Sequence, residues 1–372
     1  YIWYHYSMKT ENIHIGIVGA GNIGSTIYQL LNSTGCGYKI SIADQIEKHN
    51  IFINDDDYCK LDITKPTYDG HCTQFNQFVN GKTLIVNALP FHQNINLYKA
   101  CFELGVPYFD LSEDDALDKF IDSLKSDKLP FTMPHCGLAP GMSTVVANDL
   151  LKDIENPTSV KIRVGALSQN ASNKLRYYTS WSGEGLVNEY IGDCQILENG
   201  KYNTVDALTG YEKLTLDGSE YEAFNTSGGL GTFAKSIDGK YDSLNLNYKT
   251  LRRIGHHDYV DFLFNEMNIP QIDLTKIFSN IPKTRNDEVI LFASAGSEGM
   301  EDHRTYFKVF RPRDINGRHL TAIEYTTAIG LLTMMELYLT EKIPQEGYVR
   351  QEDVSWKDAT STTFGSIYRI EE

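Results

Sequence analysis

Short apolar runs alternate with amphipathic stretches through the first third of the chain. Helix-like segments lie at residues 22–31, 93–104 and 115–124, and residues 58–63 resemble a further short strand. This alternation predicts βαβ units and therefore an α/β fold with a parallel, Rossmann-type sheet. The apolar runs expected to form its strands lie at residues 13–19, 38–44, 83–89, 107–111 and 129–134.

The pattern changes after residue 140. A helix is predicted at 142–151, after which apolar runs are separated by Gly, Asn and Asp turns, which is typical of a mixed or antiparallel sheet in a second, α+β domain. Further helices are predicted at 259–267 and 321–339. The second of these carries Glu324 and Glu336, so we expect a helix of a soluble protein rather than a membrane span. The strands expected here lie at 160–167, 220–224, 288–295 and 305–310.

Composition narrows the classes of partner. The chain has 372 residues and a net charge of −15, which disfavours a nucleic-acid partner. Its six cysteines have no C-x-x-C spacing, so reduced thiols in a cytoplasmic protein are expected. No Cys/His cluster has the spacing of zinc ligands, and we expect no metal. Tyr1 to Ser7 precede Met8, where we expect the native start.

A glycine signature follows the first apolar run. Gly19, Gly21 and Gly24, with Asn22 and Ile23 between the last two, end a predicted strand and open an amphipathic helix. In this context the first glycine permits a tight turn, the second lets a pyrophosphate approach the backbone, and the third lets helix and strand pack closely. The helix N-terminus offers N–H groups to the anion. The signature predicts a bound dinucleotide, and the alternative is an ordinary glycine-rich turn.

Asp44 follows Gly24 by 20 residues, at the end of the second predicted strand. A carboxylate there accepts hydrogen bonds from ribose hydroxyls and repels a 2′-phosphate, which favours NAD over NADP. Asp62, after the next short strand, could reach the adenine or could be a surface turn residue. Asn87, Ala88, Leu89 and Pro90 close the fourth strand, whose end lies on the nicotinamide side of such a sheet.

Several further motifs accompany the glycine signature. They are 87–90 (NALP), 136–141 (CGLAPG), 222–229 (EAFNTSGG), 248–252 (YKTLR) followed by Gly255 and His256, 349–353 (VRQED), and Phe364 with Gly365. Together these motifs resemble the saccharopine dehydrogenase-like family, which includes glutamate-forming saccharopine reductases, lysine 6-dehydrogenases and carboxynorspermidine dehydrogenases. The resemblance covers nearly the whole chain from residue 13.

The resemblance implies three segments. These are a dinucleotide-binding domain at 8–140, a substrate-binding and dimerisation domain at 141–320, and a C-terminal helix and tail at 321–372 that returns to the first domain. It also implies a homodimer formed through the second sheet. The implied chemistry is hydride transfer from a C–N bond of an amino acid or polyamine to the nicotinamide, followed by hydrolysis of the imine.

Two positions depart from the saccharopine reductases. Those enzymes carry an acid before the proline of the 137–141 turn, where this chain has Ala139, and an arginine near the position of Thr226. In those enzymes the acid and the arginine are associated with binding saccharopine. The pattern of this chain is closer to that of the lysine 6-dehydrogenases, so oxidation of a lysine-type amine is the first hypothesis.

Polar groups that could carry this chemistry cluster where the first domain ends. Asp110, Glu113 and Asp114 could bind a substrate ammonium, although a helix start with Ser112 as N-cap would account for two of these acids. His135, with an ordinary pKa of about 6.5, could act as the base or activate water. We therefore expect Asp110 and His135 to be catalytic and Glu113 to bind substrate.

The resemblance places Thr250, Leu251 and Arg252 against the substrate. Arg252 is the expected binder of the substrate carboxylate, because a guanidinium matches a carboxylate in bidentate fashion. The alternative is an interdomain salt bridge. Lys249 and His256 are weaker candidates, Glu184 lies in a glycine-rich loop that could close over substrate, and Glu222 is expected to be a strand residue that faces solvent.

Three hypotheses therefore stand. The first is a lysine 6-dehydrogenase-like enzyme. The second is a saccharopine or carboxynorspermidine dehydrogenase acting on a secondary amine, whose substrate would require a second cation in the site. The third is a non-catalytic NAD(H)-binding sensor, which would bind the dinucleotide without turnover.

Overall fold

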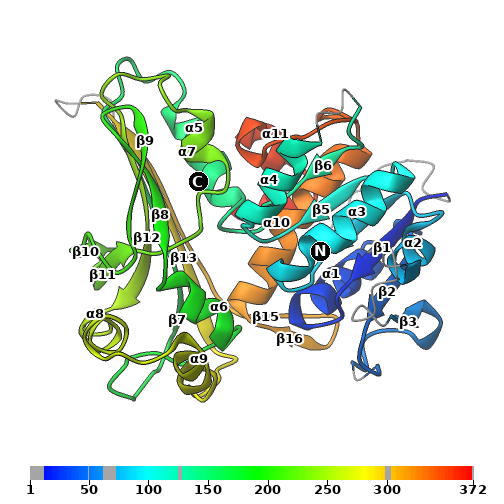
Figure 1. Cartoon of the computed structure of the whole chain (residues 1–372), viewed down its shortest axis with the longest axis horizontal. Coiled ribbons are helices and arrows are strands. Elements are labelled where there is room, and N and C mark those ends of the chain that lie inside the picture. Colours follow the sequence, from blue (N-terminus) through cyan, green and yellow to red (C-terminus); the bar gives the residue numbers. More distant parts are fainter. Residues whose placement is uncertain (1–11, 49, 62–72, 125–127, 298–302, 371–372) are drawn as a thin grey trace. The chain divides into compact units, whose positions relative to one another are not determined.

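The computed structural model describes residues 12–48, 50–61, 73–124, 128–297 and 303–370. These residues divide into two compact units, which are coloured along the chain in Figure 1. The first unit comprises the described residues up to Gly141 together with those from Thr327 onward, and the second runs from Met142 to Thr326. Asp62 and the segment that precedes Met8 lie outside the described residues.

The first unit is built on a six-stranded parallel sheet. Its strand order is β3-β2-β1-β4-β5-β6, which confirms the predicted Rossmann-type topology. Because the strands are parallel, the carboxyl ends of all six lie at the same edge of the sheet. The strands are β1 (His14–Val18), β2 (Lys39–Asp44), β3 (Tyr58–Lys60), β4 (Leu84–Asn87), β5 (Tyr108–Asp110) and β6 (Thr132–Met133).

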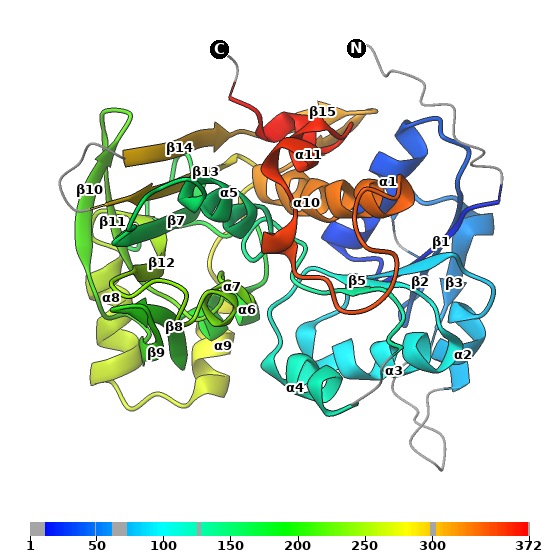
Figure 2. The ribbon, with the colours of Figure 1, turned by 90° about the horizontal axis from the view of Figure 1, so that it is seen from above.

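Helices cover both faces of this sheet. Figure 2 shows α1 and α10 on one face and α2, α3 and α4 on the other. This follows from right-handed crossovers, because the chain moves from β1 to β2 in one direction and from β3 through β4 and β5 to β6 in the other. The helices are α1 (Asn22–Ser33), α2 (Thr73–Val79), α3 (Asn94–Leu104), α4 (Asp115–Ser123) and α10 (Ala322–Leu339).

The C-terminal part of the chain completes the first unit. Tyr338, near the end of α10, packs its ring 4.4 Å from that of Phe131 and 5.8 Å from that of Phe109. The chain then runs beside the edge strand β6, where Thr132 donates to the carbonyl of Gly347 at 2.9 Å and accepts from the N–H of Val349 at 2.9 Å. The short helix α11 (Trp356–Ser361) follows.

The second unit opens with α5 (Met142–Leu151) and contains a mixed sheet, as predicted. Its order is β10-β11-β12-β7-β13-β14, in which β12 and β7 are parallel and the other neighbours antiparallel. The hairpin of β8 and β9 extends from β12. The strands are β7 (Ser159–Ser168), β8 (Asp193–Glu198), β9 (Lys201–Asp206), β10 (Glu212–Leu216), β11 (Ser219–Asn225), β12 (Asn245–Arg253), β13 (Asp287–Gly296) and β14 (His303–Phe310), with the separate hairpin β15 (Arg313–Ile315) and β16 (Arg318–Leu320).

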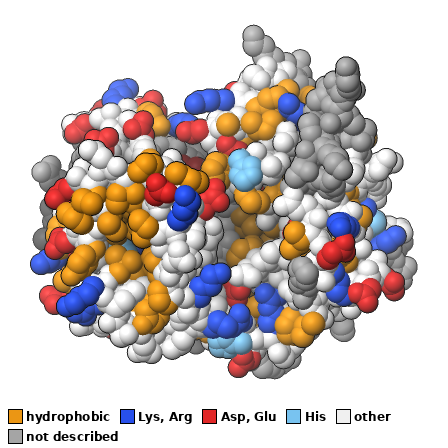
Figure 3. Space-filling view, turned by 60° about the horizontal axis from the view of Figure 1, so that its bottom comes forward, with side chains coloured by type: hydrophobic (Ala, Val, Ile, Leu, Met, Phe, Trp, Pro, Cys, Tyr) orange, Lys and Arg blue, Asp and Glu red, His pale blue; other side chains and the backbone are white. Residues whose placement is uncertain are grey.

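Small helices complete the second unit. The helix predicted at 259–267 is divided into α8 and a π-helical turn, Phe262–Glu266. Figure 3 shows hydrophobic side chains gathered on the surface over α8 and α9. None of the described helices has the length and apolar character needed to cross a bilayer. The helices are α6 (Gly183–Glu189), α7 (Phe233–Ser236), α8 (His257–Asp261) and α9 (Gln271–Ser279).

Candidate functional site

The glycine signature forms a tight turn between β1 and α1. Gly19 has φ +105°, and a Cβ atom there would lie 2.6 Å from the carbonyl oxygen of Ala88. A Cβ at Gly24 would lie 1.8 Å from the carbonyl oxygen of Gly19. At Gly21, by contrast, no described atom lies within 4 Å of such a Cβ. Two glycines are therefore required for packing, and the third leaves the backbone open to a ligand.

The start of α1 fits a dinucleotide pyrophosphate. Gly21 is the N-cap residue and supplies no side-chain cap, and the first turn contains no acid. Gly21 and Asn22 are exposed and Ile23 is half-buried. The first N–H groups of a helix lack partners inside the helix, so this end can receive an anion. The residues present therefore fit the cofactor that the sequence predicts.

Asp44 ends β2 beside the glycine turn. Its Oδ2 accepts a hydrogen bond of 2.7 Å from the N–H of Ala20, and Oδ1 accepts one of 3.3 Å from the N–H of Ile46. The carboxylate is thus fixed in orientation while the side chain is only half-buried. This is the position in which a Rossmann-type domain carries the acid for the ribose hydroxyls.

The segment after β4 is shaped by Asn87, which is buried. Its side-chain amide donates to Asn94 and to the Tyr108 hydroxyl at 2.8 Å each, and its oxygen accepts from the N–H of Leu89 at 3.0 Å. Because these bonds occupy the side chain, Asn87 sets the path of the loop. Ala88 and Leu89 are half-buried and Pro90 is exposed, so cofactor contacts predicted here would come from these three residues.

Asp110 ends β5, in register with Asn87 at the end of β4. It is buried, and its Oδ1 accepts from the N–H groups of His135 at 3.1 Å and Ser112 at 3.2 Å. No described donor forms a hydrogen bond with the buried Oδ2. Burial raises the pKa of Asp110 to about 6, although the nearby charge of His135 lowers it. A carboxyl with this pKa exchanges a proton near neutral pH.

His135 lies two residues beyond β6 and is completely buried in a left-handed backbone conformation, with φ +62°. Its Nε2 lies 3.1 Å from Oδ1 of Asp118 on α4. Its Nδ1 forms no hydrogen bond with any group in the described parts of the chain. The ring therefore has one nitrogen committed to a carboxylate and one available to a ligand.

Carboxylates determine the charge of His135. Burial alone lowers the pKa of the ring, but the hydrogen bond and charge of Asp118 raise it. The charges of Asp110 and Glu113 act in the same direction, and the resulting pKa is about 9. The ring is consequently an imidazolium at neutral pH, and it is not the neutral base that its ordinary pKa would suggest.

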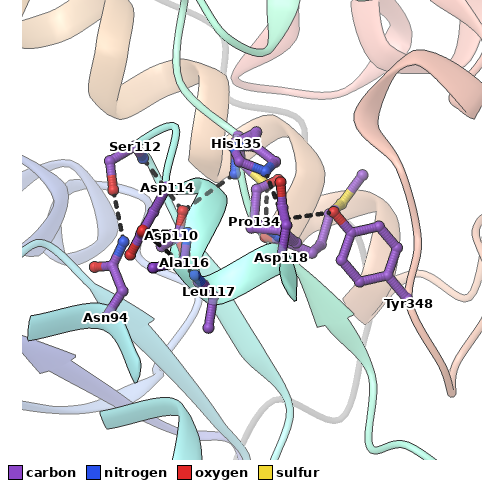
Figure 4. A network of polar contacts seen from close by, with 12 residues as sticks. Asn94, Asp110, Ser112, Asp114, Ala116, Leu117, Asp118, Pro134, His135 and Tyr348 are labelled. Atoms are coloured by element: carbon purple, nitrogen blue, oxygen red, sulfur yellow. Dashed lines mark hydrogen bonds and ion pairs between the residues drawn. The ribbon is translucent and has the colours of Figure 1, made fainter. Parts of the chain in front are cut away.

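Figure 4 shows that Asp118 links His135 to Tyr348, and neither Asp118 nor Tyr348 is among the site residues predicted from sequence. The Tyr348 hydroxyl donates to the same Oδ1 of Asp118 at 3.1 Å. Asp118 belongs to an amphipathic helix rich in acids, and Tyr348 lies 230 residues farther along the chain. No local sequence pattern identifies Asp118 or Tyr348 as a site residue, because the contact between them exists only in the folded chain.

The helix start in this region differs from the prediction. Asp114, and not Ser112, caps α4, because its carboxylate accepts from the N–H groups of Ala116 at 3.0 Å and Leu117 at 3.3 Å. The Ser112 hydroxyl instead accepts from the Asn94 amide at 2.9 Å. The N-cap assignment was therefore wrong by two residues. Asp114 is used by the helix, and Glu113 acts on His135 through its charge.

The predicted carboxylate binder, Arg252, lies in the second unit and is buried. It donates to the Tyr190 hydroxyl at 2.9 Å, to the carbonyl of Leu251 at 3.0 Å and to Glu189 at 3.0 Å. Its guanidinium also lies 5.0 Å from the centre of the Tyr177 ring. These contacts form an ion pair within the second unit, and the role of Arg252 toward a substrate stays a prediction.

The neighbours of Arg252 are likewise engaged. The Thr250 hydroxyl bonds that of Thr226 at 2.6 Å, so the two positions flagged in the sequence meet each other. Leu251 points to the opposite face of β12, into a hydrophobic cluster. His256 bonds the Tyr190 hydroxyl at 2.9 Å and the carbonyl of Leu175 at 2.8 Å.

Glu222 does not face solvent as expected, because its side chain is buried. It accepts from the N–H groups of Gly255 at 2.8 Å and His257 at 2.5 Å. It thereby satisfies the turn after β12 and the start of α8. The expectation that Glu222 is a solvent-facing strand residue is therefore wrong, because the turn at Gly255 and the start of α8 contact its carboxylate.

Comparison with known proteins agrees with this architecture. The family model described as the saccharopine dehydrogenase NADP binding domain matches residues 15–131, and that of the saccharopine dehydrogenase C-terminal domain matches residues 137–364. Among solved structures, apo saccharopine dehydrogenase (L-Glu forming) from Saccharomyces cerevisiae is 13% identical, with 93% of this chain and 95% of that chain covered and a TM-score of 0.72. Homospermidine synthase from Legionella pneumophila, in complex with NAD, is 11% identical, with 96% and 89% covered and a TM-score of 0.68.

The two structures support the fold, and the family models establish membership because the second of them alone spans more than half of the chain. Together with the glycine turn at the edge of a parallel sheet, these matches cover both units. The chain therefore belongs to the saccharopine dehydrogenase family of oxidoreductases, and its first domain is a nicotinamide-dinucleotide-binding domain.

Proposed function

We propose that this protein oxidises the terminal amine of lysine, or of a close analogue, with NAD as the hydride acceptor. The observation that carries the proposal is the charge of the cluster at the ends of β5 and β6. Asp110, Glu113 and Asp118 surround a single buried imidazolium, that of His135. Carboxylates in excess over cations stabilise a substrate that brings positive charge, which is what an amine supplies.

The order of strands supports the placement of this cluster. Along the edge of the sheet, the end of β2 with Asp44 is followed by the glycine turn after β1, then by the loop after β4, and then by Asp110 after β5. A dinucleotide held by Gly19, Gly21 and Asp44 would extend along this edge toward Asp110. When bound, the nicotinamide supplies a ring that accepts a hydride.

Two residues of the chain can manage the protons. Asp110 takes a proton from the substrate ammonium at Oδ2, leaving a neutral amine whose adjacent carbon loses its hydrogen with both electrons. The imine formed is then attacked by water, and loss of ammonia leaves an aldehyde. Once Asp110 has released its first proton to solvent, its carboxylate accepts a proton from that water and returns it to the nitrogen, which leaves as ammonia. The N–H at Nδ1 of His135 donates a hydrogen bond to the oxygen of the attacking water and holds it in place.

The proposal can be tested by following NADH absorbance with the purified chain, L-lysine and NAD, and in parallel with saccharopine. We expect turnover with lysine, and a loss of kcat/KM of about 10² to 10⁴-fold in Asp110→Asn, typical of a lost acid–base group. Asp122→Asn, which removes an exposed charge from the same sheet face, serves as the control. Activity with saccharopine alone would favour the secondary-amine alternative, and dinucleotide binding without any turnover would favour a sensor.

The preference for NAD is a separate proposal, supported by the fixed carboxylate of Asp44. In Asp44→Ser the hydroxyl can still accept from Ala20, but the charge that repels a 2′-phosphate is gone. We expect the NADP/NAD ratio of kcat/KM to rise by roughly tenfold or more. Glu47→Ser removes an exposed charge three residues away and should leave the ratio unchanged. An unchanged ratio in Asp44→Ser would contradict the assignment.

We also propose a homodimer formed through the sheet of the second unit. Half-buried apolar side chains, including Leu216 and Val309, pack around the buried cluster on one face of this sheet. In Leu216→Asp we expect the mass measured by light scattering to fall to that of the monomer. Ile272→Asp, on the apolar surface over α8 and α9, should keep the dimer. The reverse result would place the contact on that surface instead.

A further inference from the structure

The contact between Asp118 and His135 is built from three separate parts of the first unit. Asp118 comes from the first turn of α4, His135 follows β6, and Tyr348 comes from the C-terminal segment that pairs with the edge of β6. Both partners meet a single oxygen, Oδ1, at 3.1 Å each. A carboxylate held from two sides has little freedom to rotate, so its direction toward the imidazole is fixed.

The surroundings of His135 make this contact consequential. The ring is completely buried, and its backbone N–H is committed to Asp110. Its left-handed backbone conformation is one that residues with a Cβ adopt rarely, so the site holds the ring where helix and strand geometry alone would not place it. Among the described residues, the His135 side chain forms a hydrogen bond with Asp118 through Nε2, so Nδ1 is the nitrogen that faces away from this carboxylate.

We propose that Asp118 is a positioning residue, fixed by Tyr348, which holds His135 as an imidazolium with Nδ1 directed at the substrate. That a substrate lies beside Nδ1 rests on the proposed function, but the protonation of the His135 ring can be measured without turnover. Asp118 and Tyr348 act on His135 and need not touch the reacting atoms.

Three carboxylates raise the pKa of the His135 ring. Asp118 on α4 contributes its hydrogen bond and charge, Asp110 at the end of β5 contributes charge, and so does Glu113 in the loop between them. From the C-terminal segment, Tyr348 donates to Asp118. Burial raises the pKa of Tyr348, and the charges of Asp118, Glu352 and Asp110 raise it further. Tyr348 therefore donates as a neutral hydroxyl.

The experiment is a titration of the full-length chain, labelled with ¹⁵N-histidine and without cofactor, by NMR of the imidazole nitrogens. His135→Gln identifies the signal. We expect both nitrogens to be protonated at pH 7 and the pKa to be about 9. In Asp118→Asn the pKa should fall by about 1 to 3 pH units, the usual effect of losing an adjacent opposite charge. Asp122→Asn, with the same change of charge on the exposed side of α4, should leave it unchanged.

Two further variants separate positioning from a general structural effect. Asp118→Glu keeps the charge and should keep the imidazolium, and it remains informative if Asp118→Asn does not fold. Tyr348→Phe releases one side of the carboxylate and should lower the pKa of His135 by less than Asp118→Asn does. In the double variant Asp118→Asn/Tyr348→Phe, the tyrosine change should add nothing further.

The proposal is overturned if the His135 signal titrates identically in the wild type and in a folded Asp118→Asn, or if Tyr348→Phe has its full effect without Asp118. Failure of lysine turnover would overturn the proposed function and leave this result standing. With an active enzyme, Asp118→Asn should lower kcat with little change in KM, because the substrate contacts themselves are retained.

Discussion

The two units each contain a buried cationic centre surrounded by aromatic and acidic groups, and the two centres differ in how fully their polar atoms are bonded. In the second unit, Arg252 has a hydrogen bond from each of its three nitrogens, and both nitrogens of His256 are bonded. In the first unit, the described chain offers no partner to Oδ2 of Asp110 or Nδ1 of His135. Buried polar atoms without partners are costly, and these two lie close together, so the first centre retains hydrogen-bonding capacity that a ligand could use.

Burial of charge alone therefore does not locate a site. The Arg252 centre has the features of a structural element, since its guanidinium ties α6 to β12 through Glu189 and Tyr190. At the His135 centre, Oδ2 of Asp110 and Nδ1 of His135 keep hydrogen-bonding capacity that the described residues do not use. The two centres should consequently respond in different ways to substitution and to pH.

The largest expected effect is a loss of stability when the Arg252 centre is disrupted. Arg252→Met leaves Glu189 beside a buried apolar side chain, so we expect the free energy of unfolding to fall by about 3 to 5 kcal/mol. Arg253 is the next residue and forms a partly exposed ion pair with Glu288. Arg253→Met should lower the free energy of unfolding by about 1 kcal/mol or less. Urea denaturation measures both. If Arg252→Met is as stable as the wild type but loses affinity for lysine, the substrate role predicted from sequence is supported instead.

The second prediction concerns pH and His135. Its pKa is raised from 6.5 to about 9 in the folded chain, so the folded state holds a proton that the unfolded state has released between these values. The stabilisation is complete below pH 6.5 and is lost as pH rises through 9, by up to about 3 kcal/mol. Comparing urea midpoints of the wild type and His135→Gln between pH 6 and 9.5 tests this. Parallel curves would show that the ring is not an imidazolium.

The smallest expected effect concerns His256, whose pKa is shifted in the opposite direction to that of His135. Burial, together with the charges of Arg252 and His257, lowers the pKa of His256 to about 3. A ring with this pKa is neutral throughout the physiological range, and its contribution to stability is lost only as pH falls below 6.5 toward 3. The imidazole signals of His256 should therefore not move between pH 5 and 9. Movement in that range would place the two histidines in the same class.

Sequence periodicity predicted the parts of the fold that depend on local pattern. The strands and helices around Gly19, Asp44 and Asn87 were found where apolar runs and glycine chemistry predicted them. The break of the 259–267 helix into a π-helical turn was missed, because apolar spacing does not distinguish hydrogen-bonding patterns within a helix. Glu222 was misjudged because a polar residue in a strand is assigned to solvent until the covering helices are known.

The candidate site was predicted only in part. Asp110 and His135 could be found because they follow strands whose ends share an edge, which is a topological inference. Asp118 and Tyr348 could not, because neither lies at a strand end of the predicted sheet and the contact joins distant parts of the chain. The pKa values of Asp110 and His135 depend on burial and on each other's charge, and neither is a property of sequence spacing.

The contact between Tyr348 and Asp118 also constrains when the His135 centre can form during synthesis of the chain. Asp118 leaves the ribosome 230 residues before Tyr348, and the whole of the second unit is synthesised in between. At the usual rate of about 5 to 20 residues per second, the nascent chain carries an incomplete centre for roughly ten seconds or longer. The hydrogen bond between Tyr348 and Asp118 can therefore form only after the second unit has been synthesised.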